Sequence, residues 1–266
     1  MEKKDDVRSQ VREAYAKIAQ TRSENRGCAC GPSCCSPQSV DVNEVSAKLG
    51  YSSVELSGMP DGANMGLGCG NPQAIASLKE GEVALDLGCG GGVDCFLAAR
   101  HVGSSGRVIG VDMTPEMIVK AREIAKKGNY ANVEFRLGEI EHLPVADNSV
   151  DVIMSNCVVN LSPDKPQVFR DAYRVLKPGG RLAISDIVAV RDLPDTLKGD
   201  VEKLTGCVAG AAAVDELAAS LEKAGFTDIR ILTHEESRGF IQDWFPGTGV
   251  ENFVVSASIQ AKKGVR

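Results

Sequence analysis

Apolar residues between positions 80 and 190 recur with two different periods. Short apolar runs predict strands at 83–87, 107–111, 133–137, 150–155 and 181–187. Apolar residues spaced three and four apart predict helices between them, at 93–100, 115–127 and 165–176. Strands that alternate with helices are typical of βαβ units, so the pattern predicts an α/β fold built on a parallel sheet.

The flanking segments follow weaker patterns. At the N-terminus we expect a helix over 7–20 with one apolar face, an arm over 21–39, a short helix over 41–50 and a loop over 57–73. Towards the C-terminus we expect a helix over 214–224, a strand near 229–232 and an alternating edge strand over 252–261. We therefore divide the chain into an N-terminal helix and arm (1–75), a core (76–190) and a C-terminal segment (191–266).

A glycine-rich turn, DLGCGGG over 86–92, joins the first expected strand to the first helix. Glycines let the backbone approach a ligand closely, and the free N–H groups of the helix start face it. A dinucleotide fingerprint needs glycine at position 93, where this chain has Val93. Asp112 ends the second strand, 24 residues after Gly88, where a carboxylate can accept hydrogen bonds from ribose hydroxyls. Asp86 could meet a cationic ligand; the alternative is an ordinary α/β turn with surface acids.

Composition narrows the class of function. The 266 residues include 30 basic and 36 acidic side chains, a net charge of −6, which argues against a nucleic-acid binder or a membrane-surface binder. No window approaches the ~20 apolar residues of a membrane span, and the charged N-terminus has no signal-peptide core. We therefore expect a cytoplasmic location, where nine cysteines are more typical of metal-binding, catalytic or redox roles than of structural disulfides.

The stretches VALDLGCGGG, RVIGVDMTPEM, EFRLGEIEHLPVADNSVDVIMSN and RVLKPGGRL resemble the class I S-adenosylmethionine-dependent methyltransferases over about residues 80–190. The resemblance implies a Rossmann-like seven-stranded sheet with helices on both faces and an antiparallel last strand. It also implies S-adenosylmethionine as cofactor. The resemblance assigns Gly88 and Gly90 to the methionine portion, Asp112 to the ribose, and Asn156 to the sulfonium region. It assigns the adenine to the stretch Gly138, Glu139, Ile140 and Glu141, and Asp86 and Met113 complete the expected cofactor-binding set.

Three cysteines lie where the carboxyl ends of parallel strands should gather. Cys157 follows the fourth strand, Cys207 comes after the fifth, and Cys69 lies in the loop before the first. Ligands of open α/β sheets bind at this edge, and three thiolates there would form a soft, trigonal site. Each cysteine alone is more simply a small buried apolar residue, and that interpretation is kept for Cys89 and Cys95.

The further stretches GANMGLGCGNP, SNCVVNLSPDK, GCVAGA and FPGTGVENFVVSASIQAKK, with the cysteine-rich arm, resemble the arsenite methyltransferases over nearly the whole chain. The resemblance implies detoxification by methyl transfer to arsenite, with the arsenic held by Cys157 and Cys207 and with Cys69 as third thiol or redox partner. It also implies an N-terminal cysteine, for which Cys34 and Cys35 are the candidates, and reduction by thioredoxin or glutathione. Loops near 206–213 and 246–249 would cover the acceptor.

Two other interpretations remain open at this point. A carbon or oxygen methyltransferase of quinone or lipid synthesis would share the core motifs, but its chemistry would not need three converging cysteines. Alternatively, the arm cysteines Cys28, Cys30, Cys34 and Cys35 could bind zinc, copper or arsenic for storage or sensing. Their spacing matches zinc patterns only loosely. A flexible thiol-bearing arm is the simplest state of this segment.

Overall fold

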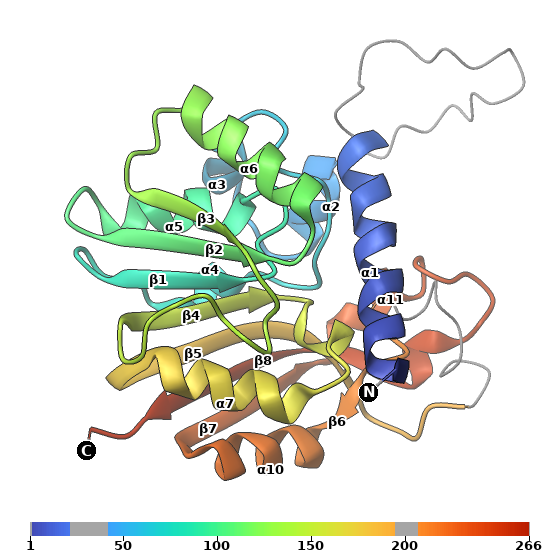
Figure 1. Ribbon diagram of the computed structural model, residues 1–266. Helices are drawn as coiled ribbons and strands as arrows, with labels where there is room; N and C mark the ends of the chain where they lie inside the picture. The colour runs from blue at the N-terminus through green and yellow to red at the C-terminus, as the bar shows by residue number, and fades with distance from the viewer. Residues whose placement is uncertain (1, 22–41, 195–206, 266) are drawn as a thin grey trace, which may run out of the picture.

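Eight strands form one mixed sheet in the computed structural model, which describes residues 2–21, 42–194 and 207–265 (Figure 1). Seven of them run side by side in the order β3-β2-β1-β4-β5-β8-β7, and the short β6 pairs with β5. Their bounds are β1 Val83–Leu87, β2 Arg107–Asp112, β3 Val133–Leu137, β4 Val150–Asn156, β5 Leu176–Ala189, β6 Ala212–Ala213, β7 Phe226–His234 and β8 Val254–Lys263. The seven-stranded core of this arrangement confirms the predicted fold class.

The parallel half of the sheet agrees closely with the hydrophobic pattern. β1 pairs in parallel with β2 and β4, β2 with β3, and β4 with β5. β5 is longer than predicted, because it begins at Leu176 instead of after Gly180. Between Val150 and Val152 the β4–β5 register shifts, so residues 177–180 form an irregularity inside the strand. Glycine and proline there indicated a break where the chain forms a bulge.

The last strand is antiparallel, as predicted, but its expected place at the sheet edge is wrong. β8 lies between β5 and β7 and pairs antiparallel with both. Both faces of β8 are covered at Val254, Val255 and Ser256, whereas β7 leaves Leu232 63% exposed at the edge. Alternation in sequence predicts a half-buried strand, and it does not tell which neighbours the strand has.

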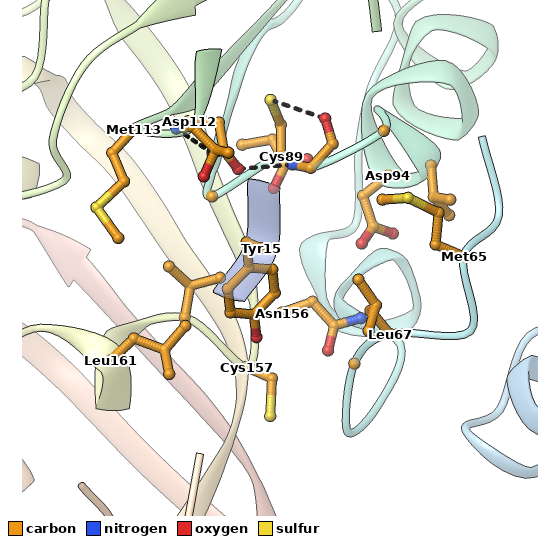
Figure 2. Close-up of a pocket in the computed structure, with 18 of the residues that line it drawn as sticks. Tyr15, Met65, Leu67, Cys89, Asp94, Asp112, Met113, Asn156, Cys157 and Leu161 are labelled. Atoms are coloured by element: carbon orange, nitrogen blue, oxygen red, sulfur yellow. Dashed lines mark hydrogen bonds between the residues drawn. The ribbon is translucent and has the colours of Figure 1, made fainter. Parts of the chain in front are cut away.

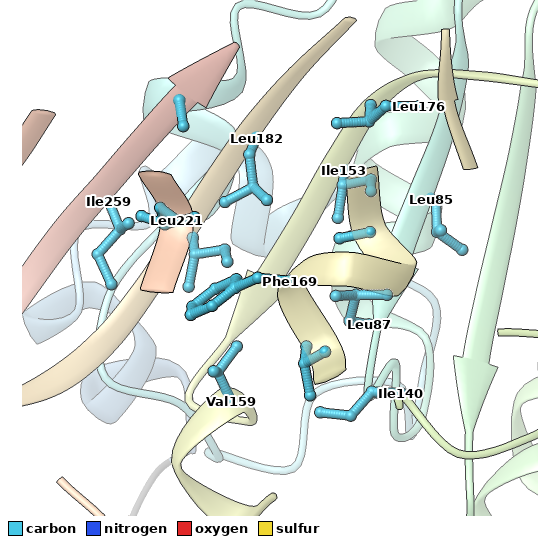
Figure 3. Packing of buried hydrophobic residues seen from close by; sticks show 14 of the residues in the cluster. Leu85, Leu87, Ile140, Ile153, Val159, Phe169, Leu176, Leu182, Leu221 and Ile259 are labelled. Carbon is cyan, nitrogen blue, oxygen red and sulfur yellow. The ribbon is translucent and has the colours of Figure 1, made fainter. Parts of the chain in front are cut away.

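Helices cover both faces of the sheet. One face packs against α7 Lys165–Val175 and α10 Val214–Ala224, whose Phe169 and Leu221 meet Leu182 and Ile259 of the sheet (Figure 3). The other face packs against α4 Pro72–Ala76, α5 Val93–Val102 and α6 Pro115–Lys127. The sheet is therefore enclosed between two layers of helices, and each helix buries the apolar face that its sequence period predicts.

The N-terminal part lies over the carboxyl end of the parallel strands (Figure 1). It comprises α1 Glu2–Thr21, α2 Val42–Lys48 and α3 Ser53–Ser57. The expected loop over 57–73 holds the end of α3 and the start of α4. Short helical segments also occur near the C-terminus, at η2 Glu235–Ser237, α11 Arg238–Ile241 and η3 Val250–Asn252, and η1 Val159–Leu161 follows β4. Within the three described ranges, no helix has the length and apolar character needed to cross a membrane.

Candidate active site

A cavity opens at the carboxyl ends of β1, β2 and β4, beneath α1 (Figure 2). β1 and β4 are the adjacent strands whose connections leave in opposite directions, which is where open α/β sheets bind ligands. Of the predicted cofactor residues, the lining includes Asp86, Gly88, Gly90, Asp112, Met113, Ile140 and Asn156. The candidate cofactor residues therefore gather around one hollow.

Asp112 is fixed by the backbone of two neighbouring segments. Its Oδ2 accepts a hydrogen bond from the Gly90 N–H at 2.9 Å, and its Oδ1 accepts one from the Thr114 N–H at 2.8 Å. Burial raises the pKa of this carboxyl, and the two backbone donors oppose the rise. At Gly88 the backbone has φ +67° and a Cβ would lie 2.5 Å from Val158, so only glycine fits. The glycine turn and the carboxylate thus form one rigid cradle.

Two further carboxylates, Asp86 and Asp94, line the same cavity. Burial and the neighbouring Asp94 raise the pKa of Asp86, to which the Cys95 thiol donates at 3.3 Å. Burial also raises the pKa of Asp94, which accepts hydrogen bonds from the Tyr51 hydroxyl at 2.9 Å and from Gln73. Sequence analysis missed Asp94 and Tyr51, because neither lies in a recognisable motif.

These residues fit the methyl donor implied by the sequence. S-adenosylmethionine carries an ammonium and a sulfonium, and buried carboxylates attract such cations. Asp86 and Asp94 supply that charge, Asp112 offers acceptor oxygens, and Met113 and Ile140 provide apolar surface for a base. The side chains that line the cavity thus match each part of this cofactor in charge and polarity.

The predicted adenine stretch is split by the structure. Ile140 lines the cavity, and so does Glu141, which receives hydrogen bonds from Ser162 at 2.6 Å and Arg8 at 3.2 Å. Gly138 and Glu139 are absent from the lining among the described residues: Gly138 abuts Pro144, and Glu139 pairs with Arg8 at 3.4 Å. The adenine assignment of these two residues stays a prediction.

Three cysteines meet behind the cavity wall. The thiol sulfurs of Cys69 and Cys157 and a carboxylate oxygen of Asp186 all lie within 4.8 Å of one another. The Cys207 thiol donates to the Cys157 carbonyl oxygen at 2.7 Å. Cys157 lines the cavity, and Cys69 and Cys207 pack with it in one buried cluster. The convergence expected from the parallel sheet is therefore present.

Local backbone geometry directs these thiols inwards. Cys157 and Cys207 have φ of +60° and +64°, a left-handed conformation that non-glycine residues rarely adopt. Strain of this kind persists where the surroundings impose it, and it concentrates at functional sites. The loop of Cys69 is tied to β4 by Asn156, whose side chain accepts from the Cys69 N–H at 3.0 Å and donates to the Gly70 carbonyl at 2.8 Å.

The three thiols are protonated at neutral pH in this state. Burial raises the pKa of Cys69 to about 12 and raises that of Cys157 well above its usual range. For Cys207 the hydrogen bond with Cys157 is the largest cause of the raised pKa, and burial adds to it. Sulfur ligands favour soft acceptors, so this buried cluster suits a soft acceptor better than a hard, hydrated metal ion.

Asp186 was not predicted from sequence, although a carboxylate inside an apolar strand is an unusual signal. It is 1% exposed, and its carboxylate accepts from the Asn160 side chain at 2.9 Å and from the Ile187 N–H at 2.8 Å. Burial raises its pKa to about 6 despite these donors. The charge of Asp186 raises the pKa of all three thiols, so it helps to keep them protonated.

The raised pKa of Asp186 makes a measurable contribution to stability. Between pH ~4 and ~6 the folded protein holds a proton that the unfolded chain releases, so this contribution is present below pH ~4 and is lost as pH rises through ~6. Relative to Asp186→Asn, wild type should therefore lose up to about 3 kcal/mol of unfolding free energy across that window. Urea unfolding of both proteins at several pH values checks this, and parallel curves would contradict the raised pKa.

The other cysteines differ from this cluster. Cys89 and Cys95 are buried beside Gly110 in the apolar core between the sheet and α5, where small packing residues were expected, although Cys89 also lines the cavity. Cys28, Cys30, Cys34 and Cys35 lie outside the described residues. The two candidates Cys34 and Cys35 therefore stay predictions.

The sequence is similar to those of known methyltransferases. Residues 78–225 match the family described as "Methyltransferase domain". An arsenite methyltransferase of Halobacterium salinarum is 50% identical over 98% of this chain and 68% of its own length. The human arsenite methyltransferase is 40% identical over 62% of this chain and 46% of its own length. This chain thus spans about two thirds of the archaeal relative and under half of the human one.

A solved structure agrees with these relatives. The arsenic(III) S-adenosylmethionine methyltransferase from Chlamydomonas reinhardtii superposes with a TM-score of 0.61 at 34% identity, covering 83% of this chain and 73% of that one. The cavity beyond β1 and β4, the fixed Asp112 and the thiol cluster are consistent with that likeness. The chain accordingly belongs to the arsenite methyltransferase family of the class I S-adenosylmethionine-dependent methyltransferases.

Proposed function

We propose that the protein methylates trivalent arsenic, which Cys69, Cys157 and Cys207 hold as a thiolate complex. The observation that carries this proposal is the meeting of three buried thiols beside the cavity that contains Asp112. A methyltransferase for carbon or oxygen would have no use for this cluster. A purely storage or sensing role would leave the cofactor cradle without a purpose.

Binding of arsenite follows from ligand exchange at the cluster. Each thiol forms an S–As bond while one As–O bond breaks, and the thiol proton leaves with the hydroxide as water. Arsenic keeps its lone pair and loses no proton, so the acceptor requires no general base. S-adenosylmethionine, when bound, supplies the electrophilic methyl group. The site has two subsites, the cofactor cavity around Asp112 and the cluster of Cys69, Cys157 and Cys207. Their residues act by holding donor and acceptor at the short separation that methyl transfer needs.

The fate of the arsenic after methylation calls for a reductant. Loss of the lone pair to the new As–C bond leaves arsenic formally pentavalent. We propose that a free cysteine thiol attacks the sulfur of one arsenic-bound cysteine: the S–S bond forms as that As–S bond breaks, the electron pair of the broken bond returns to arsenic, and the thiol releases its proton. Thioredoxin or glutathione then reopens the disulfide by thiol exchange. Cys34 or Cys35 is the proposed partner of the cluster in this step.

Mass spectrometry of the products tests the activity. The protein is incubated with arsenite, S-adenosylmethionine labelled in its methyl group, and thioredoxin or glutathione. We expect labelled methylarsenicals in amounts that grow with time and stop when the reductant is omitted. Label on a phenolic acceptor in a parallel reaction, with none on arsenic, would refute the proposal.

A further inference from the structure

Helix α1 forms one wall of the cavity. The cavity is lined by Arg8, Val11 and Tyr15. Val11 and Tyr15 follow Arg8 by three and seven residues, a spacing that places all of them on one face of the helix. The Arg8–Glu141 ion pair, at 3.2 Å, and the Lys4–Asp164 ion pair, at 2.8 Å, tie this helix to the segments that follow β3 and η1. The side chains of α1 therefore have a fixed relation to both subsites.

Tyr15 lies where the two subsites meet. Figure 2 shows its ring between Asp112 and Cys157, and the ring packs against the cluster that contains the three thiols. Burial raises the pKa of its phenol, and the carboxylates of Asp112 and Asp186 raise it further. The ring therefore stays neutral and electron-rich under all conditions in which the enzyme would work.

We propose that Tyr15 is a positioning residue whose aromatic ring stabilises the sulfonium cation of S-adenosylmethionine beside the thiol cluster. This inference rests on the proposed function, because the donor must extend from Asp112 to the thiols for its methyl to reach arsenic. The charged sulfur then has to pass the Tyr15 ring. The face of an aromatic ring attracts a cation, and the attraction grows in a site that excludes water.

The test compares two ligands that differ in charge at that sulfur. S-adenosylmethionine has a cationic sulfur, and S-adenosylhomocysteine has a neutral one. Binding is measured by calorimetry on the full chain without arsenite. We expect Tyr15→Leu to weaken S-adenosylmethionine binding about tenfold and S-adenosylhomocysteine binding less than about twofold. Tyr15→Phe keeps the ring and should keep the wild-type ratio of the two affinities.

Val11→Ala is the matched control, since it shortens a side chain on the same face of α1 without removing a ring. It should change both affinities by the same factor. If Tyr15→Leu does the same, the ring only fills space and the inference is overturned. Should Tyr15→Leu fail to fold, replacing Tyr15 by pentafluorophenylalanine keeps the shape and reverses the charge distribution of the ring face. That replacement should lower the affinity ratio, and an unchanged ratio would also overturn the inference.

These outcomes are separable from the proposed activity. The ligand comparison contains no arsenic, so it measures the role of Tyr15 alone. A wild-type protein that binds S-adenosylmethionine but leaves arsenite unmethylated would refute the proposed function without altering the affinity ratio.

Discussion

Cys157→Ser should lower the rate of arsenite methylation more than about 100-fold while the affinity for S-adenosylmethionine changes less than about twofold. A serine hydroxyl is a hard ligand that does not replace a thiolate on a soft centre. Without this ligand the acceptor is no longer held at the end of β4, and the gain from proximity is lost. Cys207→Ser should behave in the same way, because the two side chains contact each other. Product analysis and calorimetry on the same preparations measure the two effects.

Cys95→Ser is the matched control for these variants, because its hydroxyl can still donate to Asp86, as the Cys95 thiol does. It also removes a buried thiol, but from the core beneath the glycine turn and outside the three-cysteine cluster. Turnover of arsenite should survive in it. Full turnover by Cys157→Ser or Cys207→Ser, with a thiol reductant present, would mean that arsenic is not held by this cluster.

Asp112→Ala should weaken the binding of S-adenosylmethionine about 30- to 100-fold. The variant loses the carboxylate that fixes the N–H groups of Gly90 and Thr114, and with it the proposed acceptor for the ribose hydroxyls. Hydrogen bonds to charged groups contribute about 1.5–3 kcal/mol, and each 1.4 kcal/mol is tenfold in affinity. Calorimetric titration gives the dissociation constant directly.

Asp147→Ala provides the comparison for this measurement. Its carboxylate is two thirds exposed and pairs with Arg174 away from the cavity, so removing it tests the loss of a negative charge alone. Its affinity for S-adenosylmethionine should equal that of wild type. An unchanged affinity in Asp112→Ala would remove the ribose assignment.

Sequence pattern predicted β1, β2 and β4 well because each is a short apolar run buried on both faces, whereas β3, at the sheet edge, is recognised by its alternation of apolar and charged residues. It misplaced β8 because pairing between distant strands depends on which surfaces remain uncovered after the core has formed. The meeting of Cys157 and Cys207 was predictable, since parallel strands end at a common edge. Their left-handed backbone was not, because no residue type at either position demands it.

Two residues of the candidate site illustrate what pattern analysis loses. The sequence pattern identifies Tyr15 only as an apolar residue on one face of a helix. That its ring also lines the cavity becomes clear only when α1 is placed over the sheet. Asp186 lies in the apolar run of β5, where a charged residue is costly unless it is paired. A charged residue in an apolar strand is therefore a signal in the sequence. Its meaning depends on the hydrogen bonds from Asn160 and Ile187, which only the structure shows.

The left-handed conformation of Cys157 and Cys207 has a consequence for how this protein can be inactivated. Glycine occupies that conformation without the steric cost that cysteine bears, so a change to glycine relieves strain while it removes a buried side chain. The two effects on folding oppose each other. We therefore expect Cys157→Gly and Cys207→Gly to lower the free energy of unfolding less than the loss of a buried thiol at a residue of ordinary backbone conformation, so a screen for abundance would overlook them.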